Sequence, residues 1–495
     1  MKRTLAFLAA GAAISACTPA ADPAPAPQPQ PGPPQVVAAQ EFPSTPPTPG
    51  SAPRVQLPQP VRQTLSNGLT VLYVTQRELP VVSAVLVARG AGTADEPVAQ
   101  SGLASFTANM LDEGAGGRSS LELADALEAI GASLTTGAGW DNSQASLYVL
   151  RSNFPAALRI MADVVTRPDF PERELERLRS ERLTSIVRAR DEPRTIAGNA
   201  FQSLVYGPQH AYGRFATTES TQGLTRARVA QFHAQAYRPE TATLILVGDV
   251  DPAEMRPMVD AAFGQWRAAG PAGPAVAAPA EPTINRTVIY LVDKPGSAQS
   301  EIRIGHPGVA RSNPDYFPLI VMNTLLGGSF TSRLNQNLRE THGWSYGAGS
   351  SFSMLRGPGA FTAAAGVQTN ATDSSLVEFF RELKRVREES VTPEELDKAK
   401  KFLALSFPGT LETTADVARQ FATLETYGIA PAFLETYVQN VMAVTAADLQ
   451  RVANRYVRPD RSIVVVVGDR QTVEAGIRAA NLGPVELREL TEFVK

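Results

Sequence analysis

The chain has few of the residues that cross-link proteins or bind metals. It contains one cysteine, Cys17, and four histidines among 495 residues. A single cysteine excludes an intramolecular disulfide, so the folded part must be stabilised by core packing. The histidines, His210, His233, His306 and His342, show no metal-ligand spacing, and we interpret each as a surface or packing residue. We identify no nucleophile elbow or other nucleophile signature in the sequence.

The chain also lacks an excess of positive charge. It has 46 Lys and Arg residues against 49 Asp and Glu residues, a net charge of -3, and no basic block. Nothing in this pattern would displace counterions from a nucleic acid, so no nucleic-acid partner is expected. At 495 residues the chain is long enough for two or more domains, since one domain takes about 100–200 residues.

The N-terminus has the features of an export signal. Lys2 and Arg3 precede an apolar run from Leu5 to Ala13, which is too short to span a bilayer as a permanent helix. The run ends in "ISAC", and these small residues before Cys17 resemble the lipobox at which bacterial lipoproteins are cleaved and acylated. We therefore predict a signal peptide over residues 1–17 and lipidation of Cys17. An ordinary signal peptide with a chance cysteine is the alternative.

The next segment, residues 18–60, is rich in proline and poor in aliphatic clusters. It should form a stiff, partly polyproline II tether. Thr18 after the predicted lipidated cysteine resembles the pattern of outer-membrane lipoproteins. The N-terminus thus predicts a protein of the cell envelope of a Gram-negative-type bacterium, lipid-anchored on the periplasmic side of the outer membrane.

The remaining sequence contains an internal repeat. "AYRPETATLILVGD" (residues 236–249) and "RYVRPDRSIVVVVGD" (residues 455–469) share a helix end, a tyrosine, an Arg-Pro turn, an aliphatic strand and a Gly-Asp stop. "AAGPAGPAVAAPAEP" between the copies has a linker composition. We therefore predict domains over residues 61–267 and 284–495, joined by a linker over residues 268–283.

Each half opens with strands, continues with helices, and closes with a helix that leads into one more strand. This order predicts an α+β fold for each domain. The segment "PERELERLRSERLTSIVRARDEP" in the first half has apolar residues at helical spacing and alternating charges between them. It predicts a long helix with a solvated charged face.

The stretch "GLASFTANMLDEG" (residues 102–114) resembles "GLAHFLEHMLFKG" of the insulinase/pitrilysin (inverzincin) family, which includes the mitochondrial processing peptidase. In active members a helix carries H-x-x-E-H, whose histidines bind zinc and whose glutamate is the base. By this resemblance Ser105 and Asn109 stand at the histidine positions, Ala108 at the glutamate, and Ser185 at the third zinc ligand. The resemblance extends from about residue 61 to the C-terminus, and it implies antiparallel-rich sheets covered by helices in half of a clamshell chamber.

The substitutions remove the chemistry of the metal site. Zinc requires three or four close nitrogen, sulfur or oxygen donors and lowers the pKa of its bound water to about 7. Serine and asparagine are poor zinc ligands, and Ala108 cannot accept a proton. No cofactor is therefore expected on this chain.

The second half keeps another feature of the family. Arg339 and Tyr346 in "RETHGWSY" match an arginine/tyrosine pair that faces the zinc in active members and binds the substrate and the tetrahedral intermediate. A guanidinium and a phenol are suitable donors to an oxyanion. In the alternative interpretation, Arg339 lies near a helix end at Gly343, and Tyr346 is the first core residue of the next strand.

Two glycines in "LLGGSF", Gly327 and Gly328, resemble a glycine-rich loop that contacts substrate in the non-catalytic mitochondrial subunit. They could equally cap the preceding helix. In this family, peptide substrates add as a strand to a sheet edge.

Together, the residues and the resemblance predict a non-catalytic, substrate-binding subunit of a heterodimeric zinc metallopeptidase, similar to the alpha subunit of the mitochondrial processing peptidase. A homologous partner with an intact H-x-x-E-H would carry the zinc, and this chain would donate Arg339 and Tyr346 to a site that acts on peptides or unfolded polypeptides. The alternative is an inactive peptide-binding or scaffold protein of the envelope.

Overall fold

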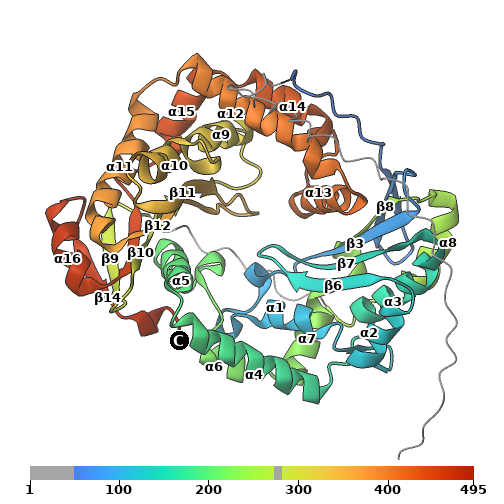
Figure 1. The fold of residues 1–495 in the computed structure, drawn as a ribbon. Helices are drawn as coiled ribbons and strands as arrows, with labels where there is room; N and C mark the ends of the chain where they lie inside the picture. The colour runs from blue at the N-terminus through green and yellow to red at the C-terminus, as the bar shows by residue number, and fades with distance from the viewer. Residues whose placement is uncertain (1–49, 272–280, 282) are drawn as a thin grey trace, which may run out of the picture. The chain divides into compact units, whose positions relative to one another are not determined.

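The computed structural model describes residues 50–271, 281 and 283–495 (Figure 1). The predicted signal peptide, the lipidation site Cys17, tether residues 18–49, and linker residues 272–280 and 282 lie outside the described residues. From Ser51 onward the chain belongs to one compact unit. This unit contains two large sheets, each with helices packed on it, so the α+β prediction is confirmed.

The sheet of the first half has six strands in the order β1-β2-β8-β3-β7-β6. Neighbouring strands are antiparallel except β2 and β8, which are parallel. The strands are β1 (Val61–Thr64), β2 (Thr70–Thr75), β3 (Val81–Arg89), β6 (Ser133–Ala138), β7 (Asn142–Leu150) and β8 (Ala242–Gly248). A separate two-stranded ribbon is formed by β4 (Gly114–Ala115) and β5 (Arg118–Ser119).

The sheet of the second half has six strands in the order β11-β12-β10-β13-β9-β14. The pairs from β11 to β13 are antiparallel, and β9 is parallel to both β13 and β14. The strands are β9 (Val288–Asp293), β10 (Gln299–Pro307), β11 (Ser345–Phe352), β12 (Ala360–Gln368), β13 (Ile463–Gly468) and β14 (Val485–Arg488).

The sequence repeat is a repeat of structure. Read from opposite ends, the two sheets share one strand order, in which β2, β8, β3, β7 and β6 correspond to β9, β13, β10, β12 and β11. The repeated sequences end in β8 and β13, which are buried along their whole length. Such unbroken aliphatic strands fit a position inside a sheet that is covered on both faces.

One face of each sheet packs on helices of its own half. The helices of the first half are α1 (Leu103–Met110), α2 (Ser120–Glu128), α3 (Phe154–Thr166), α4 (Glu172–Ala189), α5 (Pro193–Tyr206), α6 (Thr218–Gln222), α7 (Arg226–Ala236) and α8 (Pro252–Phe263). Those of the second half are α9 (Tyr316–Asn323), α10 (Arg333–Asn335), α11 (Thr372–Glu388), α12 (Pro393–Ser406), α13 (Thr414–Tyr427), α14 (Ala432–Ala443), α15 (Ala446–Tyr456) and α16 (Arg470–Ala479). The long helix predicted from its charge pattern is α4.

The other face of each sheet is covered by a helix from the opposite half. α5 packs on β10 and β13 (Figure 1), and its Phe201 shares a buried cluster with Val465 and Val467. In return α13 packs on β3 and β8, where Phe421 shares a second cluster with Val247. Each half therefore needs the other to bury its sheet.

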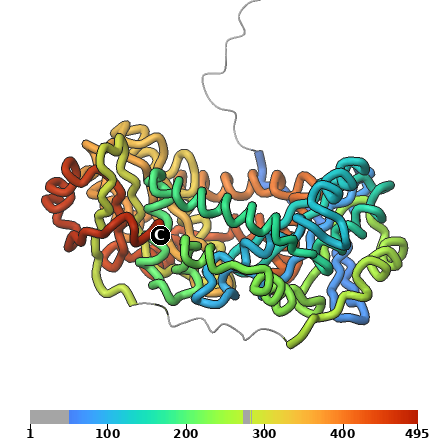
Figure 2. Tube along the Cα trace, turned by 90° about the horizontal axis from the view of Figure 1, so that it is seen from below, coloured from blue at the N-terminus to red at the C-terminus, as the bar shows by residue number. Residues whose placement is uncertain are grey.

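The two ends of the described chain are also held against the folded unit. Figure 2 shows the C-terminus beside segments of the first half, drawn in green. Asn199 donates a hydrogen bond to the carbonyl of Phe493 at 3.0 Å, and the N–H of Thr218 donates to Lys495 O at 2.8 Å. Val55 and Leu57, which fall within the range predicted as tether, pack partly buried against the cluster around α13. Among the described helices, none is long and apolar enough to cross a membrane.

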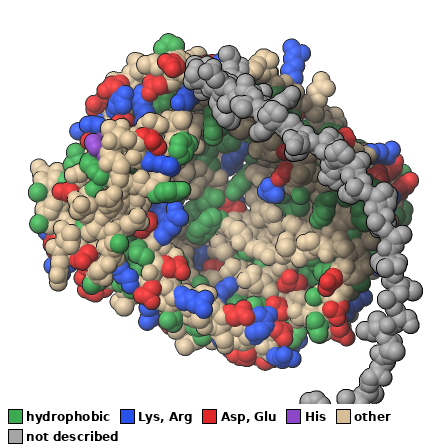
Figure 3. Space-filling model, viewed as in Figure 1, with side chains coloured by type: hydrophobic (Ala, Val, Ile, Leu, Met, Phe, Trp, Pro, Cys, Tyr) green, Lys and Arg blue, Asp and Glu red, His purple; other side chains and the backbone are tan. Residues whose placement is uncertain are grey.

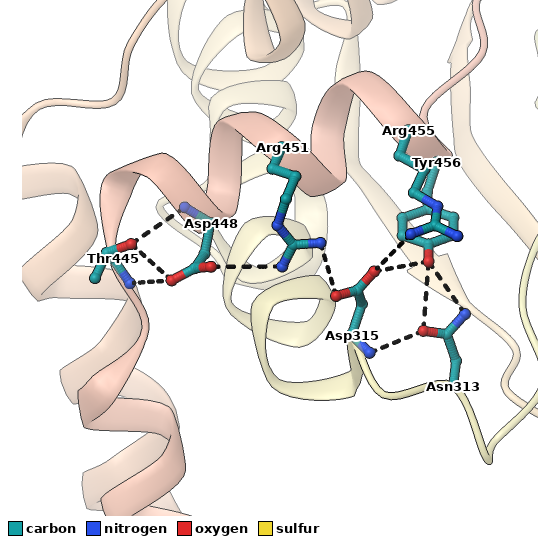
Figure 4. Close-up of polar contacts among 7 residues, drawn as sticks. All are labelled: Asn313, Asp315, Thr445, Asp448, Arg451, Arg455 and Tyr456. Carbon is teal, nitrogen blue, oxygen red and sulfur yellow. Dashed lines mark hydrogen bonds and ion pairs between the residues drawn. The ribbon is translucent and has the colours of Figure 1, made fainter.

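A polar network fixes α9 to α15 (Figure 4). Asp315, which precedes α9, accepts hydrogen bonds from Arg451 at 2.8 Å and from the Tyr456 hydroxyl at 2.7 Å. Burial would raise the pKa of Asp315, but these hydrogen bonds and the nearby guanidinium of Arg455 lower it. The network holds the start of the helical segment that leads into Gly327 and Gly328.

Candidate functional site

Helix α1 carries the positions of the lost zinc motif. Ser105 and Asn109 lie one turn apart, with Ser105 half-buried and Asn109 exposed. Ala108 is fully buried in the helix packing. The helix starts after Gly102, whose φ of 93° is left-handed and favours glycine. A Cβ there would also lie 2.8 Å from the Ala216 side chain.

Helix α4 faces α1 with Arg182 rather than with Ser185. The Ser185 side chain is exposed and donates a hydrogen bond to Glu181 O, one turn back in its own helix, at 3.0 Å. Arg182 donates to Gly102 O at 2.7 Å and to Ser105 Oγ at 3.2 Å. The residue of α4 that contacts the zinc-motif helix thus lies three positions before the residue assigned by resemblance.

The residues at this position do not fit zinc. Ser105 and Asn109 offer only neutral oxygen and amide groups, whereas zinc prefers histidine, cysteine or carboxylate ligands. The Arg182 guanidinium beside Ser105 places a positive charge there, which opposes a divalent cation. In the part of the chain that the structure describes, no three His, Cys, Asp or Glu side chains come together to hold a metal.

A buried carboxylate and a buried guanidinium lie beside the start of α1. Glu96 accepts hydrogen bonds from the N–H groups of Gly102 at 2.8 Å and Ala104 at 2.9 Å. Burial raises the pKa of Glu96 to about 7, although both N–H groups and Arg214 and Arg182 oppose the rise. Arg214 donates to Glu96 O at 3.1 Å. Sequence reasoning missed both residues because neither lies in a motif.

The four histidines have packing roles. His210 stacks on Tyr206 and accepts from the N–H of Tyr212, and His342 stacks on Trp344. The other two are held by main-chain hydrogen bonds, His233 to Val165 O and His306 to Pro307 O.

His306 should make stability depend on pH. Burial lowers the pKa of this residue to about 4, so below about pH 6.5 the unfolded chain binds a proton that the native state excludes. The free energy of unfolding should therefore fall by about 3 kcal/mol between pH 6.5 and pH 4 from this residue alone. Urea unfolding across this range should show a shallower loss in His306→Gln, which retains an acceptor but does not titrate. Equal pH slopes in the two proteins would contradict the assignment.

A cavity of about 600 Å³, formed mainly by the second half, is lined by Gly327, Gly328, Arg339 and Tyr346. The Arg339 Cζ lies 5.0 Å from the centre of the Tyr346 ring and 4.6 Å from that of Phe330. Tyr346 is 86% exposed, so the alternative that it is a core residue is wrong. Phe330, which is also exposed, was not anticipated from the sequence.

Two asparagines position this cavity against β11. Asn335 donates to Phe330 O at 2.6 Å and accepts from the N–H of Ala348 at 3.1 Å. Asn323 donates to Ser350 O at 2.9 Å. These hydrogen bonds use the Ala348 N–H and the Ser350 carbonyl on the outer edge of β11, so a further strand cannot pair with β11 at these two residues.

The two glycines lie at the end of the π-helical turn Thr324–Gly328. A Cβ on Gly327 would lie 2.2 Å from the main-chain nitrogen of Ser350, so close packing against β11 requires glycine there. A Cβ on Gly328 would lie 3.0 Å from the side-chain nitrogen of Asn323. Close packing therefore accounts for a glycine at position 327, and the substrate-binding role of the two glycines stays a prediction.

The edge of the first sheet at β6 differs from that at β11. Within the described residues β6 pairs only with β7. No other main-chain hydrogen bond from the described segments reaches residues 133–138. Unpaired N–H and C=O groups are therefore available for one further strand.

Comparison with known proteins identifies the family. The Insulinase (Peptidase family M16) profile matches residues 72–213, and that of the Peptidase M16 inactive domain matches residues 223–403. An uncharacterized zinc protease of Mycobacterium leprae is 31% identical over 310 residues, which are 61% of this chain and 68% of that protein. One of Streptomyces coelicolor is 26% identical over 421 residues, covering 83% of this chain and 90% of that protein.

A solved structure agrees with these matches. The peptidase M16 inactive domain from Pseudomonas fluorescens superimposes with a TM-score of 0.77 at 27% identity, over 83% of this chain and 98% of that chain. The family resemblance drawn from "GLASFTANMLDEG" is confirmed. The chain belongs to the insulinase (M16) family of peptidases.

Proposed function

We propose that the chain is the non-catalytic, substrate-binding subunit of a two-chain zinc metallopeptidase. The observation that carries this proposal is an asymmetry within one chain. The zinc-motif helix has no suitable ligands and contacts Arg182, whereas Arg339 and the exposed Tyr346 lie together on an accessible cavity. A homologous partner with an intact H-x-x-E-H would supply the zinc and the base.

The proposed role of the pair is to bind charge that develops on the substrate. A guanidinium and a phenolic hydroxyl can both donate hydrogen bonds to an oxyanion, and such donors act best when their positions are fixed beforehand. The contact of Arg339 with two aromatic rings and the hydrogen bonds of Asn335 would provide that fixation.

The free edge of β6 is further evidence that the substrate is a peptide. An extended peptide can pair with such an edge through its main chain, which requires no particular side chains. This mode would suit peptides and unfolded polypeptides of varied sequence.

The proposed location is the periplasmic side of the outer membrane, with a lipid anchor on Cys17. The support is the charged start, the short apolar run and the lipobox-like "ISAC" in the printed sequence. A proteolytic partner would then be a second protein of the same compartment.

Purification of the tagged full chain from its own envelope fraction tests the proposal. We expect a stoichiometric second protein with H-x-x-E-H, bound zinc in the eluate, and cleavage of a quenched peptide by the complex but not by the chain alone. Recovery of an inactive, zinc-free chain, alone or with unrelated envelope proteins, would contradict this function and favour the scaffold alternative.

A further inference from the structure

Three cavities follow one another through the folded unit. The cavity at Tyr346 shares Arg303 and Thr362 with a second cavity of about 480 Å³. That second cavity shares Trp140 and Arg214 with a third of about 300 Å³, which reaches Ser105 on α1. Together these three cavities, here called the groove, connect the Arg339/Tyr346 pair with the position of the lost zinc motif.

The groove is lined by arginines that form no close ion pair within the described residues. Arg194, Arg303 and Arg214 line it. None of the three forms an ion pair with another described residue, in a chain whose described part contains many arginine ion pairs. Buried nitrogens of Arg303 and Arg214 also have no hydrogen-bond partner there. The groove therefore carries more positive than negative charge, since Glu301 and Glu96 are the acidic residues that line it.

The acidic residues of the groove are few. Glu301 lies two positions before Arg303 on β10 and lines only the cavity at Tyr346. Glu96 lines the third cavity, and both its oxygens already accept main-chain hydrogen bonds. Figure 3 shows Lys and Arg side chains in the hollowed centre of the face it displays.

A buried guanidinium without a partner is costly, and an anion that pairs with it recovers part of that cost. Burial lowers the pKa of both Arg303 and Arg214, although Glu301 near Arg303 and Glu96 near Arg214 oppose the shift. A ligand that brings carboxylates to these residues would be bound more tightly than a neutral ligand of the same shape.

We propose that the groove selects acidic polypeptide segments, whose carboxylates pair with Arg194, Arg303 and Arg214. The inference names the substrate class of the proposed function and rests on it. A polypeptide fits better than a nucleic acid because the groove ends at Ala138, the last residue of the free edge strand β6. An extended peptide paired with β6 presents alternate side chains toward the groove.

Fluorescence anisotropy on the full chain tests this selection. Labelled peptides of one length, rich in Glu, Gln or Lys, are titrated with the protein alone, so no partner or zinc is required. We expect the Glu peptide to bind at least about tenfold more tightly than the Gln peptide, with the difference shrinking as salt rises. Equal affinity of the three peptides would overturn the proposal.

Two variants locate the effect. Arg194→Gln changes an exposed residue and should not disturb folding, and Arg303→Gln keeps a donor at the groove floor. Both should reduce binding of the Glu peptide and leave that of the Gln peptide unchanged. Arg173→Gln on α4, where the side chain is 94% exposed, is the matched control and should change neither.

The outcomes separate the two proposals. If the chain preferred acidic peptides but never gained activity with a partner, the peptidase-subunit proposal would be contradicted, while the acidic selectivity of the groove would stand. Partner-dependent cleavage without any acidic preference would overturn the groove inference alone. Equally tight binding of a single-stranded oligonucleotide of the same charge would also overturn it, because the groove would then be a general polyanion site.

Discussion

Replacing Arg339 with alanine is expected to lower kcat of the reconstituted two-chain peptidase by about 10²- to 10³-fold. The guanidinium lies beside Tyr346 and lines the cavity, and in the proposed role it would donate a hydrogen bond to the oxygen on which charge develops. Tyr346→Phe removes only the phenolic hydroxyl and keeps the ring under the guanidinium, so its loss of kcat would report the hydroxyl itself. Steady-state cleavage of a quenched peptide measures both variants.

The control for this prediction is Glu340→Gln. Glu340 forms the 3.1 Å ion pair with Arg339, and both side chains are partly exposed, so its removal should have a small effect. Size-exclusion chromatography must show that each variant still assembles with the partner. Full activity in assembled Arg339→Ala and Tyr346→Phe complexes would show that the pair does not act on the substrate.

The second large effect is expected on stability. Phe421→Ala should lower the free energy of unfolding by about 3–5 kcal/mol, because the ring is 1% exposed and fills the cluster between α13 and the first sheet. Urea denaturation of the full chain, followed by circular dichroism, measures the shift of the midpoint. Phe402→Ala on α12 is the matched control, since its ring is 48% exposed.

The same experiment tests whether the halves depend on one another. Since α13 belongs to the second half and its cluster to the first sheet, Phe421→Ala should shift the unfolding of both halves together. A variant that lost only the first half in a separate early transition would contradict this coupling, as would a shift no larger than that of Phe402→Ala.

Much of the fold could be predicted from the sequence because its signals are local. The aliphatic runs that became β8 and β13, with their shared Gly-Asp ends, indicated the repeat directly. The charge pattern of α4 indicated an exposed helix. The exchange of α5 and α13 could not be predicted, since apolar spacing shows that a helix is buried but not which sheet it covers.

The sequence also predicted those parts of the candidate site that lie in one local motif, and it missed those that depend on how separate elements pack. Arg339 and Tyr346 lie seven positions apart, and a motif could identify both. Arg182 replaced Ser185 as the contact to α1 because only the rotation of α4 about its axis decides which residue faces inward. Arg214 and Glu96 come together from distant segments, so no spacing in the sequence links them.

The reciprocal covering of the sheets by α5 and α13 has an evolutionary consequence. A single half with this architecture would leave one apolar sheet face open and would bury it only in a symmetric, domain-swapped homodimer. Duplication and fusion of its gene would place both halves in one chain, so that each half covers the sheet of the other within the same molecule. The connecting segment then raises the effective concentration of each half for the other. Once the two halves were covalently paired, one of them could lose its metal ligands without losing the structure that both maintain.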